Sequence, residues 1–197
     1  MGKLLLATNN LHKVREISDI LGKNIEIFTL RDLGIKTDIE EDRDSLEGNA
    51  VKKASEIFNI TKIPTLSDDT GLFVSALDGQ PGVFSSRYAG ENATYDDNCS
   101  KLLTELQNKP HNNMLAFFRT VICYYKSSSE YFLFEGLCKG IISTERRGNN
   151  GFGYDPLFIP DNTNKTYAEL SEEEKNRISH RSRALINFRD YFKNYLQ

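Results

Sequence analysis

Short β-rich runs alternate with segments of helical periodicity along most of this 197-residue chain. The apolar run Leu4–Ala7 is followed by apolar residues at helical spacing between Leu11 and Leu21, and Gly22 comes directly after them. A second β-rich run covers Ile25–Leu30. Alternation of this kind is typical of α/β proteins, in which helices cover a sheet. We therefore predict a mixed central sheet with flanking helices, in a single domain over residues 1–197 whose two lobes surround a cleft.

The rest of the chain continues this alternation. Beyond residue 30 we expect helices that end at Phe58 and that span 96–106 and about 173–195, and strands at 115–125 and 131–137. The last two strands are separated by a polar run, which predicts a hairpin. A further strand should start at Pro64 and lead into Ser67–Gly71, which the apolar run Leu72–Val74 follows. Ser171 followed by three glutamates marks the start of the final helix, because acids stabilise the positive end of the helix dipole.

Charge and composition restrict the class of partner. The formal net charge of -3 argues against a surface that binds duplex nucleic acid, which would be basic. No apolar run approaches the length that spans a bilayer, and the first residues lack the layout of a signal peptide, so we expect no membrane association. Three cysteines at unpaired spacings indicate reduced thiols, and three scattered histidines make a His-based metal centre unfavourable.

The segment Gly148–Pro156 combines three glycines with two aromatic residues and an aspartate. Glycines permit positive φ angles and close backbone approach, and the asparagines Asn149 and Asn150 tolerate left-handed turns. A loop that folds over a flat ligand would use Phe152 for stacking and a carboxylate as a hydrogen-bond acceptor. A loop held in place by buried hydrophobic anchors would use the same rings. On the loop alone, both interpretations stand.

A polar hexapeptide, Thr8–Lys13, lies where the first expected strand meets the first expected helix. A helix N-terminus in this position presents backbone N–H groups and the positive end of the helix dipole, which together bind phosphate. Lys13 can neutralise phosphate charge. The segment lacks the glycines of the Walker and dinucleotide motifs. A phosphate-binding turn and an ordinary capped helix with a surface lysine are therefore both open.

Carboxylates are concentrated in an acidic loop that includes Glu40 and Glu41 and in the pair Asp68–Asp69. The pair follows an apolar strand, and acids directed toward a sheet interior usually need a cation. Oxygen ligands suit Mg²⁺, which typically joins one or two carboxylates to substrate phosphates. A solvated acidic loop and a plain Asp-Asp-Thr-Gly turn are the alternatives.

Hydrogen-bond donors recur in the C-terminal segment 175–183. Lys175 precedes His180 and Arg181 by one to two helical turns. Donors of this kind can read the carbonyl edge of a base or hold phosphate. An amphipathic helix with a charged face is the alternative.

Taken together and in this order, these motifs resemble the non-canonical purine nucleoside triphosphate pyrophosphatases, the enzymes that remove inosine and xanthosine triphosphates. The matching segments extend over nearly the whole chain, and their combination is specific where no single one is. They are Thr8–Lys13, Asn49–Ala50 with Lys53–Ala54, Ser67–Leu72, Pro81–Val83, Ser86–Tyr88, Gly151–Pro156, Glu174–Lys175 and Ile178–Arg181.

The resemblance implies that water attacks the α-phosphorus of ITP, dITP or XTP and releases pyrophosphate and a nucleoside monophosphate. It implies Mg²⁺ as cofactor, with Asp69 as proton acceptor and as metal ligand together with Glu40 or its neighbour Glu41. It also implies a cytoplasmic protein that is commonly a homodimer. The expected substrate-binding residues are Thr8, Asn9, Asn10, Leu11, His12, Lys13, Lys53, Thr70, Phe152, Gly153, Tyr154, Asp155, Lys175, His180 and Arg181.

One position departs from the family pattern, which has Glu immediately before Asn49–Ala50, where this chain has Gly48. Glu47 would point roughly 100° around a helix and is no simple substitute. The family pattern, Ser/Thr-x-x-Glu, is also a capping box, of which Ser45 remains. We therefore expect Gly48 to weaken the start of the helix by about 1 kcal/mol rather than to remove chemistry.

Two other functions compete with this reading. A non-catalytic nucleotide sensor could keep the pocket, although it would not need Lys13, Asp69 and an acidic loop together. A related hydrolase of modified pyrimidine nucleotides is the second alternative, and the Phe152 loop together with His180 and Arg181 favours a purine over a pyrimidine.

Overall fold

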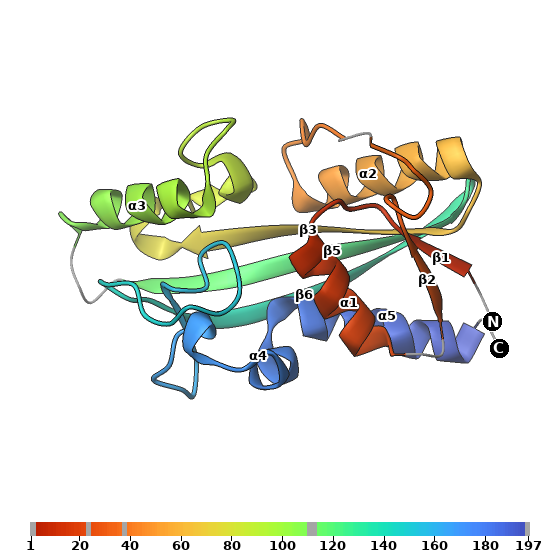
Figure 1. The fold of residues 1–197 in the computed structure, drawn as a ribbon. Coiled ribbons are helices and arrows are strands. Elements are labelled where there is room, and N and C mark those ends of the chain that lie inside the picture. The colour runs from red at the N-terminus through yellow and green to blue at the C-terminus, as the bar shows by residue number, and fades with distance from the viewer. Residues whose placement is uncertain (1–2, 23–24, 37–38, 110–113, 196–197) are drawn as a thin grey trace. The chain divides into compact units, whose positions relative to one another are not determined.

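The computed structural model describes residues 3–22, 25–36, 39–109 and 114–195. Figure 1 shows that helices flank a sheet, as the sequence predicts. The helices are α1 (Leu11–Leu21), α2 (Leu46–Thr61), α3 (Tyr95–Leu106), α4 (Glu172–Ile178) and α5 (His180–Tyr195), and the strands are β1 (Lys3–Leu6), β2 (Glu26–Thr29), β3 (Thr65–Val74), β4 (Pro81–Gly82), β5 (Leu115–Ser127), β6 (Glu130–Ile142) and β7 (Phe158–Pro160).

The sheet has seven strands in the order β2-β1-β3-β5-β6-β7, and β4 pairs with β3. Strand β1 runs parallel to β2 and β3, with Leu4 opposite Ile27 and Leu6 opposite Leu66. Strand β4 is antiparallel to β3, and β7 is antiparallel to β6. The expectation of a mixed α/β sheet is therefore confirmed.

The chain divides into two compact units. Unit 1 comprises residues 1–69, 120–136 and 181–197, and unit 2 comprises residues 70–119 and 137–180. Strands β3, β5 and β6 contribute residues to both units. The cleft and the single domain expected from the sequence stay predictions.

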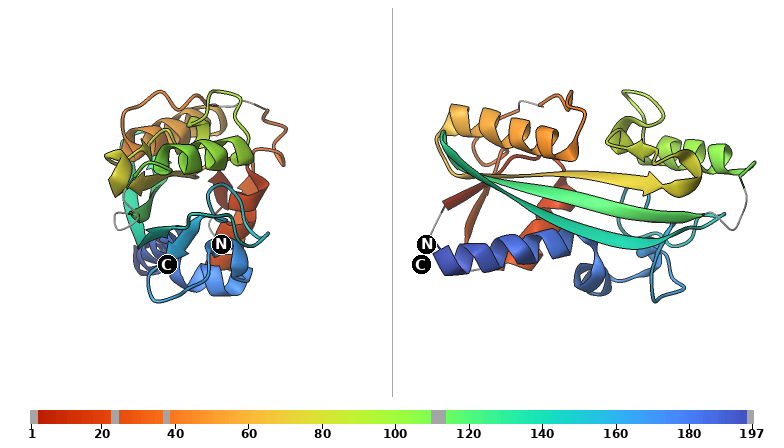
Figure 2. Two further views of the ribbon diagram at one scale, coloured as in Figure 1. Left: turned by 90° about the vertical axis from the view of Figure 1, so that its left-hand side faces the viewer. Right: turned by 180° about the vertical axis from the view of Figure 1, so that it is seen from behind.

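Unit 1 places its helices on both faces of its part of the sheet. Figures 1 and 2 show α2 on one face and α1 with α5 on the other. Leu4, Leu6 and Leu66 of the parallel strands pack in one buried cluster with Ile17 of α1 and Phe188 of α5. Burial of these apolar faces is the main stabilising contribution to the two helices.

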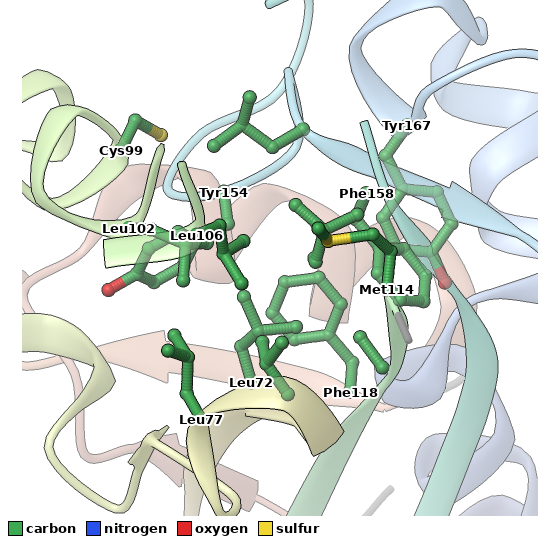
Figure 3. Packing of buried hydrophobic residues seen from close by; sticks show 14 of the residues in the cluster. Leu72, Leu77, Cys99, Leu102, Leu106, Met114, Phe118, Tyr154, Phe158 and Tyr167 are labelled. Atoms are coloured by element: carbon green, nitrogen blue, oxygen red, sulfur yellow. The ribbon is translucent and has the colours of Figure 1, made fainter. Parts of the chain in front are cut away.

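Unit 2 has its own hydrophobic core, which Figure 3 shows from close by. Leu72 and Phe118 from the sheet pack with Leu102 of α3 and with Phe158 and Tyr167. The Phe118 and Phe158 rings meet edge to face, with centroids 4.8 Å apart. This core supports the loop that follows residue 147.

The C-terminal helix differs from the prediction of one continuous helix over about 173–195. Helix α4 ends at Ile178, and α5 begins at His180. Ser179 between them is extended, with φ -70° and ψ 156°, while its N–H still donates to the Lys175 carbonyl. Serine competes with helical backbone through its own side chain and favours helix ends, which is the physical reason for the break.

The sequence left two interpretations of the Asp-Asp-Thr-Gly segment open, a pair of acids that needs a cation and a plain turn. It lies inside β3, which continues from Thr65 to Val74, so the turn reading is wrong.

The predicted hairpin is confirmed, and its strands β5 and β6 are longer than the sequence indicated. Among the described residues, no helix combines the length and apolar character needed to cross a bilayer.

Candidate active site

The junction of β1 and α1 is capped by its own side chains. The Asn10 N–H donates to Thr8 Oγ1 at 3.1 Å, and Asn10 Oδ1 accepts from the N–H groups of His12 at 3.0 Å and Lys13 at 3.3 Å. Three backbone N–H groups of this turn are thus bonded within it, two of them as in an ordinary N-cap. Lys13 itself is not a plain surface lysine, because 17% of its side chain is exposed and it reaches Asp68.

Asp68 is the centre of a buried ionic network in unit 1. Its Oδ2 lies 3.2 Å from Lys13 Nζ and accepts hydrogen bonds from Arg181 Nε and Nη2, each at 3.2 Å. Arg181 Nη1 donates to the Glu16 carboxylate. Arg181 is 2% exposed, so the network ties β3 to α1 and α5 from inside the unit.

The neighbouring charges keep Asp68 and Arg181 of this network ionised. Burial opposes ionisation of Asp68, but Lys13 and Arg181 outweigh it and keep the pKa of that carboxyl well below its usual range. Burial likewise opposes the charge of Arg181, and Glu16 with Asp68 raises its pKa above the ordinary value. Among the described residues, no group donates a hydrogen bond to the buried Oδ1 of Asp68.

Asp69 belongs to a second group, formed with side chains of α2. Lys53 Nζ donates to Asp69 Oδ1 at 3.1 Å and to Glu41 Oε1, so one ammonium joins two carboxylates. Asn49 Nδ2 donates to Asp69 Oδ2 at 3.2 Å, and Asn49 Oδ1 accepts the Arg43 N–H at 3.0 Å. Both Asp69 oxygens are therefore held by side chains from one helix.

The surroundings of Asp69 favour a carboxylate that can take up a proton. Burial raises the pKa of Asp69 to about 6, with a further increase from Glu41 and an opposing effect of Lys53. Burial would also raise the pKa of Glu41, but Lys53 reverses the direction and lowers it. Lys53 stays protonated, since Asp69 and Glu41 together outweigh its desolvation and raise its pKa.

Of the two candidate acids in the acidic loop, Glu41 is the one that reaches this group. Glu40 is exposed, and its backbone carbonyl accepts a hydrogen bond from Lys52 Nζ at 2.9 Å. In the described part of the chain, no three His, Cys, Asp or Glu side chains cluster as a metal-binding set. Two adjacent carboxylates that already share a cation do fit Mg²⁺, which keeps several waters and commonly uses one or two protein carboxylates.

The segment Gly148–Pro156 forms a tight loop in unit 2. Gly148, Gly151 and Gly153 have φ angles of 80°, 77° and 63°, as the sequence predicts for glycines in this context. A Cβ at Gly151 would overlap the Asp155 carboxylate, and a Cβ at Gly148 would overlap the backbone of Ala168. The loop therefore requires glycine at positions 148 and 151 for space as well as for conformation.

Asp155 organises the ring that the loop presents. Its Oδ2 accepts the Phe152 N–H at 2.8 Å and a hydrogen bond from Lys175 Nζ at 2.7 Å. Lys175 Nζ also lies 5.0 Å from the centroid of the half-buried Phe152 ring. Tyr154, by contrast, is 4% exposed and donates its hydroxyl to the Ser85 carbonyl at 2.9 Å. Tyr154 is thus a hydrophobic anchor of unit 2, visible in Figure 3.

His180 and Arg181 are neighbours in sequence but have different surroundings. The His180 ring is buried and stacks on Phe118 in unit 2, with centroids 4.5 Å apart and planes 20° apart. Arg181 belongs to unit 1, where its guanidinium bonds to Asp68 and Glu16. A direct contact of Arg181 with a base would require these bonds to rearrange, so its expected role stays a prediction.

The start of α2 keeps its cap despite Gly48. Ser45 Oγ accepts the Gly48 N–H at 3.1 Å. A Cβ at position 48 would lie 2.9 Å from Arg43 Cβ and 3.1 Å from Ser45 Oγ. Glycine at this position thus makes room for Arg43, whose N–H holds Asn49 beside Asp69.

Comparison with known proteins places nearly the whole chain in one family. The sequence matches the Ham1 family over residues 4–191. The chain belongs to the Ham1 family. The matched range includes every residue of the Asp68, Asp69 and Phe152 groups described above.

Relatives and solved structures extend this result over nearly full length. A protein of Thermoanaerobacter sp. (strain X514) named dITP/XTP pyrophosphatase is 49% identical over 190 residues, which cover 96% of each chain. One of Porphyromonas gingivalis with the same name is 48% identical and covers 97% of each chain. The structure of a HAM1 protein from Coxiella burnetii is 36% identical, with a TM-score of 0.89 over 98% of this chain and 100% of that one.

Three residues of these groups were not predicted as site residues. Glu16 bonds to Arg181 and Asn49 bonds to Asp69, and because these partners lie far apart in sequence, no local pattern indicates the two pairings. Tyr95 lies against Phe152, with ring centroids 5.9 Å apart. Of the three, only Asn49 lies in a segment that resembles the family, where it stands directly before Ala50.

Proposed function

We propose that this chain hydrolyses dITP, ITP and XTP to the nucleoside monophosphate and pyrophosphate, and so removes these nucleotides from the cellular pool. The observation that carries the proposal is the group in which Lys53 joins Asp69 to Glu41. Membership of the Ham1 family and the names of relatives almost half identical to this chain support the choice of substrate.

Asp69 would act as the general base. A water oxygen forms a bond to the α-phosphorus, the bond from that phosphorus to the bridging oxygen of pyrophosphate breaks, and the water proton passes to Asp69. Burial gives this carboxylate the raised proton affinity that a base needs. Asn49 and Lys53 fix its two oxygens, so its direction is set before the substrate arrives.

Positive charge for the triphosphate would come from Lys53 and Lys13. Each already faces a carboxylate, Lys53 at Asp69 and Lys13 at Asp68, which keeps both lysines ordered without a ligand. Phosphate oxygens would compete for these ammonium groups as the charge of the transferred group develops.

Magnesium is part of the proposal, and Glu41 with Asp69 would hold it. When bound, Mg²⁺ would neutralise charge on the phosphate oxygens. Lys53 Nζ, which bonds to both of these carboxylates, would add positive charge for the phosphates beside the ion.

Phe152, Lys175 and His180 would recognise the base. The Phe152 ring can stack on any purine, so stacking alone does not select deaminated bases. A donor directed at a 6-keto oxygen is satisfied by hypoxanthine or xanthine and left unpaired by the 6-amino group of adenine. Buried donors without a partner discriminate strongly.

On the family resemblance we also propose a homodimer that acts in the cytoplasm.

Incubation with ITP, dITP, XTP and ATP in the presence of Mg²⁺, followed by identification of the products, tests the proposal. We expect pyrophosphate and monophosphate from the first three and little from ATP. Orthophosphate and diphosphate as products would refute the cleavage position. Nucleotide binding without turnover would support the alternative of a sensor, and omission of Mg²⁺ tests the cofactor.

A further inference from the structure

An exposed tyrosine that no motif predicted lies against the ring assigned to base stacking. Tyr95 is the first residue of α3, and its ring is tilted by 45° to the ring of Phe152, with centroids 5.9 Å apart. The side chain is 44% exposed, whereas α3 buries Cys99, Leu102 and Leu106 in the core. Tyr95 therefore contributes to the surface beside the Phe152 loop rather than to the core of unit 2.

The turn that carries Tyr95 is fixed from both sides. Thr94 and Asp97 form a capping box, in which Thr94 Oγ1 accepts the Asp97 N–H at 3.1 Å and Asp97 Oδ2 accepts the Thr94 N–H at 2.8 Å. Arg146 donates to the Asp96 carbonyl at 2.9 Å and to Ser100 Oγ at 2.7 Å. The Tyr95 ring is thus presented by a rigid helix start rather than by a mobile loop.

Asp155 holds the backbone N–H of Phe152, and Lys175 Nζ lies near its ring. A half-buried ring keeps rotational freedom unless a neighbour restricts it, and stacking on a base requires a defined plane. Tyr95 is a neighbour suited to this task, since a tilted aromatic pair is a favourable arrangement and the helix start beneath it is rigid. In unit 1, the rings of Tyr125 and Tyr131 stack with centroids also 5.9 Å apart and provide a matched comparison.

We infer that Tyr95 is a positioning residue for base binding: it sets the plane of the Phe152 ring and thereby strengthens binding of the purine, without contact with the phosphates. The inference rests on the proposed function, because it concerns the same substrate. The relevant atoms are those of the ring, so Tyr95→Phe should retain the effect and Tyr95→Ala should lose it.

The test compares Tyr95→Ala, Tyr95→Phe and the matched control Tyr131→Ala, which removes a 50% exposed tyrosine that stacks on another ring. We expect Tyr95→Ala to raise the KM for ITP about three- to tenfold with kcat unchanged, the size of effect typical for loss of one aromatic pair. The inhibition constant of inosine monophosphate should rise by the same factor, and that of tripolyphosphate should not change. Tyr95→Phe and Tyr131→Ala should resemble the wild type.

Three results would overturn the inference: an unchanged inosine monophosphate constant in Tyr95→Ala, an equal rise for tripolyphosphate, or a Tyr95→Phe variant as weak as Tyr95→Ala. Alanine is a good helix former at this position, and the melting temperature of each variant shows whether the fold is intact. Failure of the proposed function is a separate outcome, since the wild type would then not hydrolyse ITP at all.

Discussion

Asp68 and Asp69 are consecutive residues of β3, yet each binds cations from a different face of the sheet. Asp68 pairs with Lys13 of α1 and Arg181 of α5, and Asp69 pairs with Lys53 of α2. Successive side chains of a strand point to opposite faces, so adjacency in sequence separates the two carboxylates in space. In unit 1 the first is a structural anchor, and the second is the candidate base.

Replacement of Asp69 by Asn tests this division. We expect kcat for ITP to fall by about 10²- to 10⁴-fold, because a general base contributes an effect of that order, while the substrate still binds. Steady-state kinetics and binding of ITP measure the two quantities. Asp78→Asn is the matched control, since Asp78 is exposed and adopts a left-handed conformation that Asn tolerates. An active Asp69→Asn enzyme would show that the base is another group.

Removal of Arg181 should destabilise the protein rather than only weaken catalysis. Arg181→Met leaves Asp68 and Glu16 without their shared buried cation, and loss of one partner of a buried pair lowers the free energy of unfolding by about 3–5 kcal/mol. Denaturant unfolding measures the change. Arg177→Met is the control, because its pair with Glu173 is exposed and should matter little. Equal stability of the two variants would contradict the role of the network.

Most helices and strands of the fold could be predicted from patterns among neighbouring residues. Helix α1 spans Leu11–Leu21 as predicted, because apolar spacing and a terminal glycine are properties of neighbouring residues. Segment 67–71 was ambiguous, since two acids before Thr-Gly suit a turn as well as a strand. Only the place of β3 between β1 and β5 in the sheet decides that case.

The candidate site could be predicted from the sequence only in part. Most residues around Phe152 and Asp69 could be named from their motifs, but which of them pair with one another could not. Arg181 and Asp68 are 113 residues apart, and nothing near either residue indicates the other. Ser179 breaks the predicted final helix with one extended residue, which serine favours at helix ends but which helical periodicity does not indicate.

Two buried thiols should be unreactive in the native protein. Burial raises the pKa of Cys99 to about 11 and that of Cys123 to about 12, so at pH 8 about one thousandth of Cys99 is thiolate. The raised native pKa also stabilises the fold below the unfolded value of about 8.5, and this contribution is lost as pH rises toward 11. Ellman's reagent should label both thiols slowly in buffer and rapidly in guanidinium. Fast native labelling of either residue, located by peptide mapping, would contradict this.

The Gly48→Ala substitution should raise the free energy of unfolding by less than helix propensity alone predicts. Propensity favours Gly48→Ala by about 1 kcal/mol, but the new Cβ would lie 2.9 Å from Arg43 Cβ and must displace it. Asn59→Ala, on an exposed position of the same helix, is the control and should show its full propensity gain. Because the Arg43 N–H holds Asn49 beside Asp69, we also expect a lower kcat in Gly48→Ala. A gain of the full 1 kcal/mol with unchanged kcat would show that Arg43 yields freely.

Alanine at position 151 should weaken base binding through Asp155. The residue has φ 77°, where any Cβ introduces strain of about 1–2 kcal/mol, and here the Cβ would also overlap the carboxylate that holds the Phe152 N–H and Lys175. Gly34→Ala separates the two effects, since Gly34 has φ 68° and a Cβ there would meet no atom within 4 Å. Both variants should lose similar stability through strain, but only Gly151→Ala should raise the inhibition constant of inosine monophosphate. If that constant stays unchanged, the position of the Asp155 carboxylate does not control the Phe152 ring.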